Sequence, residues 1–251
     1  MCIIIAKPQG AKMPKEDIFK RCFERNPDGS GLAYYREGDK SVRIVKGFMD
    51  YPSLLKSIRR LCLGRKDACL FHFRLATHGL ADEGNCHPFP ISDKISELRN
   101  RRINVNIAVA HNGIFSDMPQ HNTLSDTQKF IRLILSHDSI KDNITDGAVR
   151  ELLKGYCGSS SRLAFITNKG EIVTIGNWVK DKGIYYSNEG FKEYRFERYS
   201  GFASWDDEYI KSDKQTYAFM ECDSCGNIKD VHYNQDFKCV LCDDCESDLS
   251  V

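Results

Sequence analysis

Cys2, directly after Met1, is the first residue in the sequence that could carry out chemistry. If Met1 is removed, the Cys2 thiol and a free α-amino group belong to one residue. An α-amine has an ordinary pKa of about 7.7 to 8.0, so a useful fraction is neutral near pH 7 and can accept the thiol proton. Alternatively, Cys2 is a structural cysteine at the start of an apolar strand predicted over 2–6.

Three further segments place residues that could take part in chemistry at the end of an apolar run or at the start of a helix. Arg74 ends one run, Asn112 and Gly113 end another, and Asp126 follows Ser125 at the predicted start of a helix. These residue types could supply a guanidinium for a carboxylate, amide donors for an oxyanion, and a carboxylate for an ammonium group. Each also has a structural interpretation: a surface ion pair, an ordinary turn, and a charge favoured at a helix N-terminus.

The order of these segments resembles the glutaminase domain of class II glutamine amidotransferases over about residues 1–187. The resemblance is carried by the start MCII, then HFRLATHG at 72–79, NCHP at 85–88 and HNG at 111–113. The family has MCGI, HTRWATHG, NAHP and HNG there, and its RGYDSAG segment is similar to residues 25–31. Ile3 stands where the family has glycine, and Leu75 where it has an aromatic residue.

This resemblance implies a hydrolase that attacks the side-chain amide of glutamine. Cys2 would be the nucleophile and its α-amine the base. The remaining catalytic residues would form the oxyanion hole or order the site beside Cys2: Asn112, Gly113 and Arg25. Among the substrate-binding residues, Arg74 would hold the α-carboxylate, with Thr77 and His78 nearby. Asp126, together with Gly113, would hold the α-ammonium group.

Short β-like runs alternate with amphipathic stretches along the chain. We predict strands at 2–6, 31–35, 42–45, 68–74, 105–110, 162–167, 171–175 and 183–187, and helices at 15–25, 51–61, 126–136 and 146–156. Ser125 and Gln128 have the spacing of a capping box, and 168–170 has the composition of a hairpin turn. Hairpins with helices in blocks favour an α+β fold of antiparallel sheets covered by helices. The resemblance implies the four-layered αββα sandwich of N-terminal-nucleophile hydrolases.

The C-terminal tail has a different composition. Five of the 11 cysteines lie between Cys222 and Cys245, and four of them form two C-x-x-C pairs separated by residues 226–241. This spacing predicts a small module with one structural zinc ion on four thiolates: Cys222, Cys225, Cys242 and Cys245. Cys239 is an alternative ligand. We place the domain boundary near Ala218, so that 1–217 is the amidotransferase domain and 218–251 the zinc ribbon.

Charge and hydropathy exclude several classes of protein. Lys and Arg number 36 and Asp and Glu 35, which gives no reason to expect a nucleic-acid or anionic-membrane partner. No apolar run is long enough for a membrane span, so a cytoplasmic protein is predicted. The tail is too short to hold an ammonia-consuming site, so we expect a separate synthase as partner. The alternatives are a hydrolase of another γ-glutamyl or amide substrate, or a zinc-ribbon adaptor that has lost or subordinated catalysis.

Overall fold

The computed structural model describes residues 2–75, 82–119, 123–193, 216–221, 228–234 and 239–243. The chain divides into two compact units, Met1–Arg195 and Phe196–Val251. The boundary predicted near Ala218 lies inside strand β12 (Thr216–Glu221) of the second unit, and the assignment of each part to a domain type stays a prediction. Within the described residues, no helix is both long enough and apolar enough to span a bilayer.

The described strands of the first unit form two antiparallel sheets, as the hairpin pattern predicted. The larger sheet has the order β10-β11-β1-β4-β2-β3-β6. Its strands are β1 (Ile3–Lys7), β2 (Ser30–Tyr35), β3 (Val42–Phe48), β4 (Ala68–Phe73), β6 (Arg102–Val105), β10 (Val179–Asp181) and β11 (Ile184–Tyr186). The smaller sheet has the order β5-β7-β8-β9. Its strands are β5 (Phe89–Pro90), β7 (Ile107–Asn112), β8 (Arg162–Thr167) and β9 (Ile172–Ile175).

The two sheets pack face to face through small side chains. Ile4 and Ala6 of β1 belong to one buried cluster with Ala108 and Ala110 of β7 and with Ala164 of β8. Alternate residues of a strand point to opposite faces, so the other apolar side chains of β1 lie on the outer face of the larger sheet. This explains why β1 is apolar from Ile3 to Ala6: both of its faces are buried.

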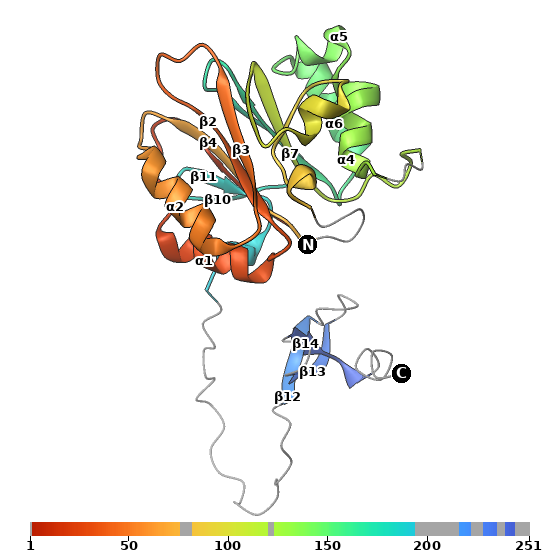
Figure 1. Ribbon diagram of the computed structural model, residues 1–251. Coiled ribbons are helices and arrows are strands. Elements are labelled where there is room, and N and C mark those ends of the chain that lie inside the picture. The colour runs from red at the N-terminus through yellow and green to blue at the C-terminus, as the bar shows by residue number, and fades with distance from the viewer. Residues whose placement is uncertain are drawn as a thin grey trace, which may run out of the picture. The chain divides into compact units, whose positions relative to one another are not determined.

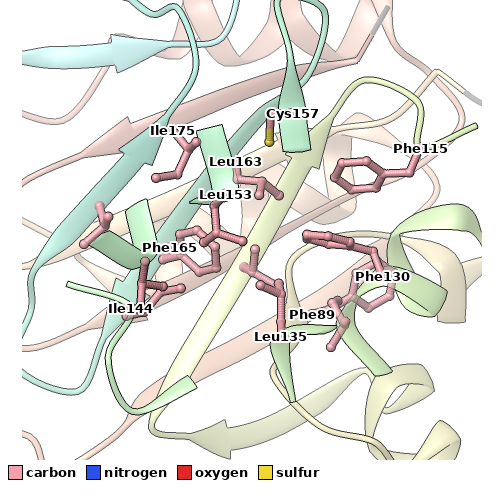
Figure 2. Close-up of a cluster of buried hydrophobic side chains, with 14 of the residues drawn as sticks. Phe89, Phe115, Phe130, Leu135, Ile144, Leu153, Cys157, Leu163, Phe165 and Ile175 are labelled. Atoms are coloured by element: carbon pink, nitrogen blue, oxygen red, sulfur yellow. The ribbon is translucent and has the colours of Figure 1, made fainter. Parts of the chain in front are cut away.

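Helices cover the outer face of each sheet (Figure 1). Helices α1 (Glu16–Arg25) and α2 (Tyr51–Leu61) pack on the larger sheet. Helices α4 (Asp126–Phe130) and α6 (Gly147–Cys157) pack on the smaller sheet, and Figure 2 shows the cluster beneath them. Two short helices, α3 (Ile95–Arg99) and α5 (Asp138–Lys141), complete this side. The first unit is therefore layered αββα, with Cys2, Arg74 and Asn112 at the ends of strands.

Local sequence signals were confirmed where they are strong. The Ser125–Gln128 capping box is present at the start of α4, and Gly170 adopts φ +77° in the turn that joins β8 and β9. The predicted helix 126–136 changes character at Ile131, because a π-helical turn runs over Ile131–Leu135 and the Ser136 N–H donates to the Ile131 carbonyl oxygen at 2.8 Å. The short elements β5, α3, β6, α5 and β10 were not predicted, since two to five residues are too few to show a period.

The second unit contains a three-stranded antiparallel sheet among its described residues. Its order is β12-β13-β14, with β13 at Ile228–Asn234 and β14 at Cys239–Leu241. Four of its side chains are described: Val231, His232 and Cys242, which are buried, and Asp243, which is exposed. The predicted zinc-binding character of this unit stays a prediction.

Candidate active site

Cys2 lies immediately before β1, at one edge of the larger sheet. Ile3 pairs with Phe73 of β4, so the main chain of Cys2 runs beside the residues that follow β4. The Leu75 N–H donates to the Cys2 Sγ at 3.3 Å, and the thiol lies 3.4 Å from the Leu75 carbonyl oxygen. On the other side, the Asn188 side chain donates to the Cys2 carbonyl oxygen at 2.9 Å. Cys2 is thus fixed by segments on both sides of β1.

Arg74 is held by the loop that precedes β2. Its N–H donates to the Gly29 carbonyl oxygen at 2.8 Å, and its carbonyl oxygen accepts from the Asp28 N–H at 3.0 Å. The residue is 5% exposed, which is unusual for an arginine. Arg74 and Leu75 line the same pocket as Cys2, so a cation and the thiol share one cavity.

Asn112 ends β7, and Gly113 begins the loop that follows it. The Asn112 side chain donates to the Ser187 Oγ at 2.9 Å, and this hydroxyl also accepts the Ile4 N–H at 2.8 Å. Gly113 has φ +147°, and a Cβ atom there would lie 2.3 Å from the Ser161 Oγ. No side chain fits at position 113, and Ser187 ties the start of β1 to the end of β7.

Asp126 begins α4 and its carboxylate has a fixed orientation. The Phe115 N–H donates to Oδ2 at 2.8 Å, and the Thr127 N–H donates to Oδ1 at 2.8 Å. Asp126, Thr127 and Ser125 line the pocket that contains Cys2. An anionic carboxylate therefore faces the same cavity as the Arg74 guanidinium.

Three buried histidines pack around the pocket: His72, His87 and His111. Burial lowers the pKa of His72 to about 3 and that of His111 to about 4, and it holds the pKa of His87 well below its usual range. Arg74 lowers the pKa of His72 and His87 further, because a second positive charge nearby disfavours protonation. All three rings are therefore neutral at pH 7, so none of these three histidines is an imidazolium that could act as a general acid.

The Cys2 thiol has its pKa raised from its usual range. Burial is the main cause, because it disfavours the thiolate, and the hydrogen bond from Leu75 opposes this effect in part. The group is therefore a neutral thiol at pH 7. A nucleophile of this kind needs a nearby base to accept its proton as it attacks.

The predicted site residues divide into three groups by position. Four of them line one pocket: Cys2, Arg74, Gly113 and Asp126. Asn112 lies beside this pocket without being part of its lining, and Arg25 lies on α1, where its Nη1 donates to the Gly190 carbonyl oxygen at 2.8 Å and lies 3.3 Å from the Lys192 carbonyl oxygen. Thr77 and His78 lie outside the described residues.

Sequence reasoning gave no role to several residues that the structure brings to this region. Ser187 and Asn188 hold the main chain of β1 and Cys2, and Thr127 and His111 lie beside Asp126. The signals were weak: Ser187 ended a predicted strand, and His111 preceded the Asn112–Gly113 turn. A polar residue at a strand end has too many possible roles for its partner to be predicted.

Only one of the four predicted zinc ligands, Cys242, lies among the described residues, where it is buried. Nearby, the His232 Nδ1 lies 3.5 Å from the Asp243 Oδ1. Cys222, Cys225 and Cys245 lie outside the described residues, as does the loop between β12 and β13. In the part of the chain that is described, no three histidine, cysteine or acidic side chains gather as a metal ion would require.

Comparison with protein-family models and with curated protein sequences finds no match. Among solved structures, the chain is similar to a glutamine phosphoribosylpyrophosphate amidotransferase from B. subtilis complexed with ADP and GMP, at 14% identity and a TM-score of 0.43. It is also similar to a structure described as the allosteric regulatory enzyme of purine biosynthesis, at 13% identity and a TM-score of 0.41. Each similarity covers 74% of this chain and 41% of the solved chain, so this chain spans less than half the length of either protein.

Proposed function

We propose that the protein is a glutamine amidotransferase or glutaminase in which Cys2 attacks the side-chain amide of glutamine. The observation that carries this proposal is the composition of one pocket. A thiol, a guanidinium, a backbone N–H at a glycine and a carboxylate converge there, from Cys2, Arg74, Gly113 and Asp126. Glutamine presents the complementary groups: an amide carbon, an α-carboxylate, a carbonyl oxygen and an α-ammonium.

The chemistry begins with the thiol proton. Once Met1 is removed, the α-amine of Cys2 accepts the proton as Sγ attacks the side-chain carbonyl carbon of glutamine. The negative charge that forms on the carbonyl oxygen is stabilised by the Asn112 amide and the Gly113 N–H. Ammonia leaves with the proton, a γ-glutamyl thioester remains on Cys2, and water hydrolyses it to glutamate. The raised pKa of the buried thiol supports this order, because a base is needed only at the moment of attack.

Substrate binding in this scheme uses groups that keep their charge during the reaction. Arg74 pairs with the α-carboxylate, and Asp126 pairs with the α-ammonium. The Asp126 carboxylate is oriented in advance by two backbone N–H groups, which lowers the entropic cost of binding. Thr77 and His78 are assigned to the carboxylate side on the sequence resemblance alone.

The ammonia passes to an acceptor enzyme, which we propose to be a separate protein. We also propose that the second unit binds one structural zinc ion through Cys222, Cys225, Cys242 and Cys245. Four thiolates leave no open coordination position, so this zinc stabilises the unit and takes no part in the chemistry. Purified protein should contain about one zinc ion per chain. Cys242→Ser should lose the metal and keep full glutaminase activity.

Covalent labelling tests the proposed nucleophile. The glutamine analogue 6-diazo-5-oxo-norleucine should add once, at Cys2, in protein whose intact mass shows the loss of Met1. Cys2→Ala should abolish both labelling and glutamate release, because no thioester can form. Cys2→Ser should be much weaker, since a hydroxyl gives up its proton less readily than a thiol.

The matched control is Cys62→Ala, because Cys62 is an exposed thiol that lies outside the pocket. This variant should label and turn over like the parent. Labelling at a cysteine other than Cys2, or glutamate release that persists in Cys2→Ala, would reject the proposed nucleophile. Turnover of other γ-glutamyl amides but not of glutamine would favour the alternative substrate class.

A further inference from the structure

Residue 111 is the point where three buried histidines meet. The His111 N–H donates to the Nδ1 of His87 at 3.2 Å, and the His111 carbonyl oxygen accepts from the Nε2 of His72 at 3.1 Å. The rings of His72 and His87 stack on each other with centroids 4.2 Å apart. Two imidazoles thus fix the main chain of His111 at the end of β7.

The His111 side chain contacts other residues than its main chain does. Its Nδ1 lies 2.8 Å from the Thr127 Oγ1, and its ring stacks on Phe115 with centroids 4.0 Å apart and planes 7° from parallel. Phe115 in turn stacks on Phe130 of α4, at 4.2 Å. The imidazole therefore contacts two residues: Phe115, which follows β7, and Thr127, in the first turn of α4.

These same two residues hold the Asp126 carboxylate. The Phe115 N–H donates to one oxygen and the Thr127 N–H to the other, each at 2.8 Å, and the Thr127 Oγ1 lies 3.4 Å from the second oxygen. His111 thus contacts both residues whose N–H groups donate to Asp126. Its ring stacks on Phe115, and its Nδ1 is hydrogen-bonded to the Thr127 hydroxyl. The direct contacts of the carboxylate do not include His111 itself.

We propose that His111 is a positioning residue, whose imidazole sets the orientation of the Asp126 carboxylate through Phe115 and Thr127. The inference rests on the proposed function, in which this carboxylate receives the α-ammonium of glutamine. His111 touches neither the reacting amide nor the thiol in this scheme, so its removal weakens substrate binding and leaves the chemical step intact.

The tautomer of His111 follows from the same contacts. If Nδ1 carries the proton, the ring donates to the Thr127 hydroxyl, and this hydroxyl can donate to the Asp126 carboxylate. The Nε2 then keeps a lone pair, and it is a buried atom with no hydrogen-bond partner. The opposite tautomer would leave an N–H group buried without an acceptor, which costs more. The pKa of about 4, caused by burial, keeps the ring neutral, so that it does not compete with the ammonium group for Asp126.

Kinetics with two substrates test the proposal. Glutaramate has the amide and the carboxylate of glutamine but lacks the α-amino group. His111→Phe keeps a ring that can stack on Phe115 and loses the hydrogen bond, so KM for glutamine should rise roughly tenfold with kcat within about twofold. The kcat/KM for glutaramate should stay unchanged. An equal loss on both substrates would mean a general structural role and would overturn the proposal.

Three further variants separate positioning from damage to the fold. Thr127→Val removes the same hydrogen bond from the other side, and its effect should not add to that of His111→Phe, because both break one link. His111→Asn restores a donor near the position of Nδ1 and should recover part of the loss. The control is His137→Phe, at an exposed histidine that precedes α5, which should behave like the parent. Fully additive effects would contradict the proposed link.

Amide hydrogen exchange decides the matter even if the parent chain does not hydrolyse glutamine, a result that would reject the proposed function and not this inference. The Phe115 N–H in both His111→Phe and Thr127→Val, and the Thr127 N–H in His111→Phe, should exchange at least about fivefold faster than in the parent and in His137→Phe. Unchanged protection at both amides would show that the carboxylate keeps its place without His111.

Discussion

The two ends of strand β1 both carry buried polar groups, and they use them differently. At one end, the Lys7 Nζ is enclosed by carbonyl oxygens, at 2.7 Å from Gly64 and 2.5 Å from Asp67. The carbonyl oxygens of Pro8 and Arg65 lie at 3.3 and 3.5 Å. An ammonium group has three donors, so its capacity is fully used by the main chain. Lys7 closes the turn between α2 and β4 and does not line the pocket that contains Cys2.

At the other end of β1, residues from four segments line one cavity. Cys2 and Arg74 come from the larger sheet, Gly113 from the smaller sheet and Asp126 from α4. Backbone groups orient these residues without enclosing them. The contrast teaches that burial of a polar group alone does not identify a site. A structural group has all its partners in the chain, whereas a candidate functional group is held in place and still faces a space that a ligand can enter.

Apart from loss of the Cys2 thiol itself, removing an oxyanion donor should produce the largest effect at this end of β1. Asn112→Ala should lower kcat for glutamine by roughly 10² to 10³, while KM changes little, because the donor acts on charge that develops during the reaction. Ser187→Ala is the matched control, since it removes the partner of Asn112 and keeps the amide itself. A loss of equal size in Ser187→Ala would mean that Asn112 acts mainly as a link to β1.

Low pH should lower the free energy of unfolding through the buried histidines near Cys2. Lys7 should not contribute to this effect. His72 and His111 have pKa values of about 3 and 4 in the folded chain, against 6.5 when unfolded. Between these values the unfolded chain binds more protons, so the free energy of unfolding falls as the pH is lowered through this window. The expected slope is roughly 1.4 kcal/mol per pH unit for each histidine.

Thermal melts between pH 7 and pH 4 would measure this slope. Lys7→Met leaves both histidines in place, so it should melt at a lower temperature with the same dependence on pH. A melting temperature that does not change across the window would contradict the neutral, buried state of the two histidines.

A substitution at Lys7 should lower the stability of the fold and leave glutaminase activity unchanged. Lys7→Met keeps an unbranched side chain one atom shorter and leaves the carbonyl oxygens of Gly64 and Asp67 without their donor, which should cost about 1–3 kcal/mol of unfolding free energy. Denaturant unfolding would measure the loss. Glutaminase activity well below the melting temperature should equal that of the parent, and a changed kcat would show that the two ends of β1 are coupled.

The smallest effect is expected at Arg25, which acts on the Cys2 end from a distance. It binds the Gly190 carbonyl oxygen, in the turn that follows Asn188, and Asn188 holds the Cys2 carbonyl oxygen. Arg25→Ala should lower kcat by about two- to fivefold through a small displacement of Cys2. Asn188→Ala should reproduce this loss in steady-state kinetics. An effect in Arg25→Ala as large as that of Asn112→Ala would place Arg25 in the site itself.

Local patterns in the sequence were enough to predict most elements of the first unit. Strand β8 and helix α2 were predicted at their observed bounds, and the capping box and the β8–β9 hairpin are present as expected. These signals depend on residues a few positions apart, which the chain brings together in almost any fold. The π-helical turn at Ile131 could not be predicted, because it depends on packing against the smaller sheet.

The sequence by itself determined which residue types could form a site and where the longer strands and helices of the first unit lie. Only the tertiary structure decided that Ser187 joins Ile4 to Asn112, and that His111 lies between Phe115 and Thr127. The Ile4–Ser187 hydrogen bond joins residues 183 positions apart, and the bond between Lys7 and Asp67 joins residues 60 apart. No local period encodes such contacts. They depend on strand order and on the face that each side chain takes, which are settled only when the sheets and helices pack together.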